Sequence, residues 1–100
     1  MRHLIAVALI ATTALPALAE TRKQRETRCA AQSEIVAQAI EMRQKRKSEA
    51  KTKEAILETL DASLAPSVPI LVGYVYTLNR KDLKQDIPGA FKTQCSEFKQ

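Results

Sequence analysis

The sequence is short of the residue types on which most enzymes and cofactor proteins depend. It holds one histidine, His3, and two glycines, Gly73 and Gly89, and its two cysteines, Cys29 and Cys95, do not form a C-x-x-C pair. His3 lies in a predicted signal peptide (residues 1–19, below), so we expect the mature chain to contain no histidine. Such a chain has no Ser–His or Cys–His nucleophile system and no imidazole metal site. Two isolated glycines exclude a glycine-rich phosphate loop, and the missing C-x-x-C excludes thioredoxin-type chemistry and covalent haem attachment. We therefore expect no enzymatic activity, no cofactor and no metal.

Residues 1–19 carry the three regions of a secretory signal peptide in the usual order. Arg2 supplies the positive charge, an apolar run covers residues 4–15, and small residues precede a cleavage site after Ala19. The run is shorter than the ~20 residues of a membrane-spanning helix, which argues against a retained membrane anchor. Glu20 rather than a cysteine follows the cleavage site, so a lipoprotein anchor is not expected. We predict export to the periplasm or secretion, loss of the histidine with the signal, and no transmembrane segment afterwards.

The two cysteines predict a disulfide between Cys29 and Cys95. Exported proteins meet an oxidising environment, and two cysteines allow only one intramolecular pairing. The bridge would close a loop of about 67 residues, for which the chain-entropy model gives about 4 kcal/mol. That is comparable with the ~3–5 kcal/mol that the core of so small a domain supplies. A redox switch is the alternative, but apart from Arg28 few groups are present to tune a thiol.

Apolar residues at helical spacing predict an all-α domain over residues 29–100. We expect a bundle of three to four helices, in up-down or orthogonal packing, pinned by the disulfide. Residues 20–28 have no large apolar side chain and are predicted to be a basic N-terminal arm or a frayed first turn. The first helix should cover about residues 27–45, with Thr27 as its N-cap. Its buried stripe holds Ile35, Val36, Ala39 and Ile40.

Residues 43–53, here called the basic turn, follow with six cations, one acid and no large apolar side chain. The cations are Arg43, Lys45, Arg46, Lys47, Lys51 and Lys53. The segment either bends into a hairpin near Lys47 or continues as one long helix. We favour the hairpin, because so short a chain buries its apolar stripe only if the next segment folds back on the first.

The second helix is predicted over residues 52–65, capped by Ser48 or Thr52 and stopped by Pro66. Its inward face should carry Ile56, Leu60 and Leu64, with Leu57 beside them. Its outward face should carry Glu54, Glu58 and Asp61. That solvated position argues against a catalytic carboxylate pair.

Residues 67–79 combine the β-branched and aromatic residues of a strand with apolar residues at helical spacing. No second strand is available for pairing, and an isolated strand would leave its backbone polar groups unbonded. We therefore predict a buried helix, with Pro69 in its first turn and Gly73 at a close contact with another helix. Tyr74 and Tyr76 are expected at the edge of the core, with their hydroxyls in water.

The last helix should begin after Asp86, its N-cap, with Pro88 in the first turn. Its apolar stripe consists of Ile87, Phe91, Cys95 and Phe98. Both cysteines therefore fall on buried stripes of helices at opposite ends of the chain. Leu83 is expected to hold the preceding polar connection, residues 79–85, against the core.

Positive charge is concentrated in one half of the chain. Residues 21–53 hold ten Lys or Arg against four acids, and residues 54–100 hold five against six. Loss of Arg2 with the signal lowers the formal net charge from +5 to +4. The basic turn is the candidate surface for anionic lipid, a cell-wall polymer or an acidic protein, the alternative being a solvated turn. Nucleic acid is not expected, because export separates the chain from it and no aromatic residues alternate with the cations.

Three functions fit these features. The first is a non-enzymatic periplasmic or secreted interaction protein that holds an unknown protein or an anionic envelope component through its basic turn or an apolar groove. The second is a stress chaperone. The export signal, the short helical chain and the single long-range disulfide resemble the layout of periplasmic acid-stress chaperones. The resemblance is one of architecture, and no motif matches beyond the two cysteines. The third is a protein whose basic turn binds an anionic membrane surface.

Overall fold

A computed structural model describes residues 20–97, and all regular secondary structure in this part of the chain is helical. The elements are α2 (Arg22–Gln44), α3 (Glu49–Thr59), the 3-10 helix η1 (Ala62–Ser67), α4 (Val68–Thr77), the 3-10 helix η2 (Asp82–Lys84) and α5 (Ile87–Glu97). The predicted all-α fold with one disulfide is confirmed for this part of the chain. The predicted signal peptide and Phe98 lie outside the described residues. Within residues 20–97, no helix combines the length and apolar character needed to cross a bilayer.

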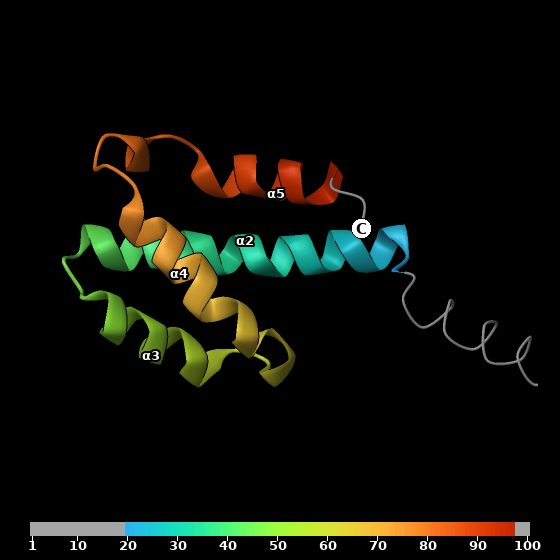
Figure 1. Cartoon of the computed structure of the whole chain (residues 1–100), viewed down its shortest axis with the longest axis horizontal. Coiled ribbons are helices and arrows are strands. Elements are labelled where there is room, and N and C mark those ends of the chain that lie inside the picture. The colour runs from blue at the N-terminus through green and yellow to red at the C-terminus, as the bar shows by residue number, and fades with distance from the viewer. Residues whose placement is uncertain (1–19, 98–100) are drawn as a thin grey trace, which may run out of the picture.

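Helix α2 is the element on which the others are arranged (Figure 1). Helix α3 folds back beside it, α5 runs along it from the other side, and α4 crosses it obliquely. The two connections α2–α3 and α4–α5 therefore lie at the same end of the molecule.

The N-terminus of α2 is fixed by a capping box that we had not predicted. The Thr21 hydroxyl accepts a hydrogen bond from the Gln24 backbone N–H at 3.0 Å, and the Gln24 side chain accepts one from the Thr21 N–H at 2.9 Å. These two bonds satisfy donors that a helix start leaves free. The helix therefore begins at Arg22, so the prediction of an arm over residues 20–28 and of Thr27 as N-cap is wrong.

The hairpin between α2 and α3 is confirmed. Helix α2 ends at Gln44, and the Ser48 hydroxyl caps α3 by accepting a hydrogen bond from the Lys51 N–H at 3.2 Å. Thr52, the other predicted cap, is instead completely buried inside α3.

Helix α3 ends earlier than the sequence pattern predicted. Leu60 is extended, with ψ of 148°, and the Asp61 carboxylate accepts from the Ser63 N–H at 3.4 Å to start η1. Short acidic side chains compete with the helical backbone for its own donors in this way. Pro66 therefore lies within η1 and does not stop α3. As a second correction, Leu57 is 44 % exposed and does not join the core.

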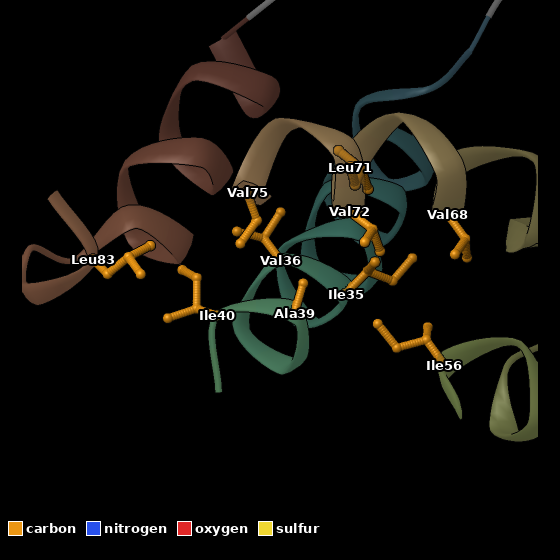
Figure 2. Close-up of a cluster of buried hydrophobic side chains, with 10 residues drawn as sticks. All are labelled: Ile35, Val36, Ala39, Ile40, Ile56, Val68, Leu71, Val72, Val75 and Leu83. Atoms are coloured by element: carbon orange, nitrogen blue, oxygen red, sulfur yellow. The ribbon is translucent and has the colours of Figure 1, made fainter. Parts of the chain in front are cut away.

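The core is formed where α4 packs on α2, as Figure 2 shows. The helix predicted for this segment is confirmed, and Val68, Val72 and Val75 are fully buried on its inner face. The buried cluster comprises Ile35, Val36, Ala39, Ile40, Ile56, Val68, Leu71, Val72, Val75 and Leu83. Burial of Leu83 confirms that it holds the α4–α5 connection against the core.

Gly73 is not the close-packing point that we predicted. A Cβ built at this position would lie 3.8 Å from the Glu49 carboxylate and meet no nearer atom of the described chain. That is an ordinary van der Waals distance, so α4 does not need a glycine here. Gly89 differs, because a Cβ there would clash with Asp86, whose carboxylate accepts from the Gly89 N–H at 3.0 Å. Asp86 is thus confirmed as the cap of α5.

The predicted disulfide joins α2 to α5, with 5.7 Å between the two Cα atoms. Cys29 is completely buried, whereas Cys95 is only half-buried, so the stripe of α5 is shallower than predicted. No described residue of α5 is fully buried, and only Ile87 and Phe91 pack against the core from it. The bridge is therefore a constraint on α5 in addition to its packing along α2, which buries little apolar surface of α5.

Replacing both cysteines, Cys29→Ala with Cys95→Ala, should release α5 before the rest of the domain unfolds. The chain-entropy model gives a loss of about 4 kcal/mol in the free energy of unfolding. Hydrogen exchange should show fast amides in residues 87–97 and protected amides in α2 and α4. The oxidised wild-type protein is the reference, and equal protection of α5 in both proteins would contradict the assignment.

Candidate functional site

The turn between α2 and α3 is a Schellman motif built on an arginine. The Arg46 N–H donates to the Arg43 carbonyl at 2.9 Å, and the Lys47 N–H donates to the Met42 carbonyl at 3.0 Å. Arg46 has φ of 65°, a left-handed conformation that favours glycine or asparagine and costs another residue roughly 1–2 kcal/mol. The exposed Arg46 therefore occupies a backbone position that glycine would fill without this strain.

The six predicted cations of the basic turn divide into three groups. Lys45 pairs with Glu41 at 3.0 Å, and Lys53 pairs with Glu49 at 3.1 Å. Arg46, Lys47 and Lys51 are exposed, and their side chains make no hydrogen bond or ion pair with any residue between 20 and 97. The six cations are therefore not equivalent. Three have charges free of described partners, two are neutralised by ion pairs, and the sixth, Arg43, is described next.

Arg43 forms the third group, because it is built into the fold. Its Nη1 donates to the Val75 carbonyl at 2.6 Å, and the guanidinium carbon lies 5.7 Å from the centre of the Tyr76 ring. Both contacts reach α4, so Arg43 joins the last turn of α2 to the last turn of α4. The cation–π distance is within the ~6 Å over which a ring attracts a guanidinium.

Tyr76 fixes the basic turn from the side of α4. Its hydroxyl donates to the Lys47 carbonyl at 2.6 Å and lies 2.8 Å from the Thr52 hydroxyl. Since a phenol has one hydrogen to donate, the Thr52 hydroxyl is the donor to Tyr76. The prediction of a solvated Tyr76 hydroxyl is therefore wrong: this group holds the turn and α3 in place.

Tyr76→Phe should lower the free energy of unfolding by about 1–3 kcal/mol, because the buried Thr52 hydroxyl loses its partner. Chemical denaturation measures the loss. The matched control is the pair Tyr76→Phe with Thr52→Val, in which no buried hydroxyl remains and part of the stability should return. A neutral Tyr76→Phe would show that the two hydrogen bonds contribute nothing.

A second group of cations reaches the same end of the molecule from the α4–α5 connection (Figure 1). Arg80 and Lys84 line a hollow of about 340 Å³ together with Arg43, Gln44 and Leu83. We call the combined surface the basic end. It consists of Arg43, Lys45, Arg46, Lys47, Arg80, Lys81 and Lys84. Within residues 43–47 and 80–84 the one acid is Asp82, and Glu41, just before the first segment, is already paired with Lys45.

Arg80, Lys81 and Lys84 were not among the predicted site residues, because residues 79–85 were predicted to be a polar connection. Three cations among residues 80–84 were a visible signal. What the sequence could not show is that this connection lies beside the end of α2.

An uncharged groove lies between α4 and α5. Ile70, Tyr74 and Phe91 are among its lining residues, and its volume is about 390 Å³. Ile70 is 73 % exposed and Tyr74 is 44 % exposed, so the rim of the groove presents apolar surface to solvent. None of the described residues that line the groove is charged.

The surroundings of the bridge are polar but already paired. Arg28 holds the Glu20 carboxylate with two hydrogen bonds, of 2.8 and 3.0 Å, and its Nη1 lies 3.6 Å from the Cys95 sulfur. The hydrogen bond from Arg28 lowers the pKa of Glu20, an effect that desolvation opposes and the charges of Arg28 and Arg25 reinforce. The same hydrogen bond raises the pKa of Arg28.

A further hollow, of about 660 Å³, lies beside these residues between the first turns of α2 and η1. Lys23 and Arg28 are its cations, and Arg28 is already engaged by Glu20. Its location is remote from the basic end, and it brings together no group of reactive side chains.

The described residues contain no group of three or more His, Cys, Asp or Glu side chains that could hold a metal ion. The fold therefore defines a small all-α protein pinned by one disulfide, with a basic end and an uncharged groove as its notable surfaces. Comparisons of the chain with protein-family models, with curated proteins and with solved structures found no match.

Proposed function

We propose that this chain is a non-enzymatic, exported binding protein that contacts an anionic partner through its basic end. The observation that carries the proposal is the meeting of two separate cationic segments, residues 43–47 and 80–84, at one end of the bundle. Such a cluster of like charges repels itself, and an anionic surface removes that repulsion. Each cation near an anionic membrane surface contributes about 1 kcal/mol of attraction.

The conformation of Arg46 gives separate support. A left-handed residue other than glycine is strained, and strain of this kind is retained where it serves a purpose. The charge of Arg46 is the property that glycine at this position would lack. We infer that the chain keeps the arginine for binding.

Export is supported by the pattern of residues 1–19 and by the Cys29–Cys95 bridge. Disulfides persist in the periplasm and outside the cell and are rare in the reducing cytosol. We accordingly place the protein in the periplasm or the secreted fraction, where anionic head groups and charged cell-wall polymers are accessible.

Arg46→Gly should raise stability and weaken binding at the same time. Removing the strain should add about 1 kcal/mol to the free energy of unfolding. Losing one cation should weaken co-sedimentation with phosphatidylglycerol vesicles about fivefold. Binding of the wild-type protein should fall steeply as salt is raised.

Charge reversal provides the matched comparison. Arg46→Glu with Lys47→Glu should reduce vesicle binding by at least about tenfold. Lys23→Glu with Lys92→Glu makes the same change in net charge at exposed positions outside the basic end and should leave binding nearly intact. Equal losses in both pairs, or equal binding to phosphatidylcholine vesicles, would refute the proposal.

The groove between α4 and α5 favours a stress chaperone as the second candidate. Ile70 stands 73 % exposed at its rim, beside lining residues without charge, and so offers contact to apolar segments of an unfolding protein. Acidification would also loosen the bundle near its bridge, since the Glu20–Arg28 pair stabilises the fold only while Glu20 is ionised. With the pKa of Glu20 lowered, that contribution is complete above the ordinary carboxylate pKa of 4.5 and is lost as the pH falls through the lowered value.

Under this second candidate, the wild-type protein should suppress aggregation of an acid-unfolded client at about pH 2–3. Ile70→Gln should lose much of that activity, because it removes apolar surface without touching the core. Leu57→Gln, at the other well-exposed aliphatic position, is the control and should retain it. Light scattering measures the aggregation, and an inert wild-type protein at low pH would exclude the chaperone.

A further inference from the structure

The hollow at the basic end is lined by one anchored cation, Arg43, and by two exposed cations, Arg80 and Lys84. Arg43 and Gln44 come from the last turn of α2, Arg80 from the connection after α4, and Lys84 from η2. Leu83, 7 % exposed, anchors η2 in the core and so fixes the position of this wall. Arg80 and Lys84 are exposed and can adjust to a ligand.

Arg43 differs from the three arginines at the start of α2. Arg22 pairs with Glu26, and both Arg25 and Arg28 face Glu20. Arg43 is half-buried, yet among residues 20–97 it has no carboxylate partner. Its only hydrogen bond to a described residue is the one to the Val75 carbonyl, although a guanidinium has five N–H donors.

A partly buried guanidinium without a counter-ion is costly unless something else supplies the negative charge. The contacts of Arg43 with Val75 and Tyr76 hold it in place before a ligand arrives, which reduces the entropy lost on binding. Asp82, the acid of the same connection, does not line the hollow. Among residues 20–97, no carboxylate therefore lies within ion-pair distance of Arg43 or lines the hollow beside it.

We infer that this hollow binds a phosphate group, with Arg43 as the pre-positioned donor and Arg80 and Lys84 as cations that close on it. The planar guanidinium matches two phosphate oxygens, and a lysine ammonium adds a point charge. Gln44 can donate through its side-chain amide to a further oxygen. The inference rests on the proposed function and specifies it: Arg46 and Lys47 attract an anionic surface, and the hollow holds one phosphate from it.

The phosphate can belong to a lipid head group or to a free phosphorylated compound, and two probes separate these sources. Glycerol 3-phosphate, titrated into the oxidised protein and followed by NMR, tests the hollow alone. Vesicles of phosphatidylglycerol test the membrane source. Sodium chloride at matched ionic strength is the reference for the titration, because it screens charge without offering a phosphate.

Arg80→Gln with Lys84→Gln removes two cations from the hollow, and Lys23→Gln with Lys92→Gln removes two exposed cations outside the basic end. All four side chains are exposed, so both pairs should fold. The first pair should weaken glycerol 3-phosphate binding at least about tenfold, and the second by less than about threefold. Saturable shifts in the wild-type protein should include the amides of Leu83 and Lys84.

Equal weakening in both pairs, or shifts that sodium chloride reproduces, would overturn the phosphate site. If phosphatidylglycerol vesicles still bind the wild-type protein in that case, the proposed function survives and only the hollow is refuted. If glycerol 3-phosphate saturates the hollow while vesicles do not bind, the site stands and the membrane source is excluded.

Discussion

The packing of α4 on the apolar stripe of α2 is the contact on which the rest of this structure depends. Val68, Val72 and Val75 are completely buried there against Ile35 and Val36. Branched aliphatic side chains of this size fill a narrow interface with few rotamers to fix, but they bury little area each. No aromatic side chain within residues 20–97 is fully buried. The core is therefore small, and the covalent link to α5 supplies a constraint that packing alone does not.

The stabilising contacts and the proposed binding surface lie at opposite ends of α2. At its N-terminal end lie the disulfide, the capping box and the Glu20–Arg28 pair. The capping box bonds free backbone N–H groups, and the ion pair neutralises the charge of Arg28. At its C-terminal end lie cations in excess and a strained Arg46. Contacts to uncharged groups hold this end together: Arg43 to a backbone carbonyl, and Tyr76 to another. Apart from the Lys45–Glu41 pair, the fold thus maintains a concentration of like charge at this end without ion pairs among residues 20–97 to neutralise it.

Much of the fold could be predicted from local spacing. The helical period of residues 67–79 outweighed their β-branched composition, since the chain offered no second strand. The two cysteines left one pairing, which the structure shows. Element boundaries were less predictable, because single side chains decide them: the Thr21–Gln24 box starts α2, and Asp61 ends the helical run of α3. Thr21 and Gln24 match the T-x-x-Q pattern of a capping box, but the charge and the lack of large apolar residues in residues 20–28 favoured a basic arm.

The sequence by itself determined the helices, the hairpin and the bridge, because these follow from contacts within a few residues or from having only two cysteines. Only the tertiary structure decided that Arg80 and Lys84 join Arg43, a meeting of segments far apart in the chain. It also decided that Arg43 is anchored and has no carboxylate partner among residues 20–97, while Lys45 has one. The physical reason is that the crossing of α4 over α2 sets which connections share an end, and no local pattern encodes that angle.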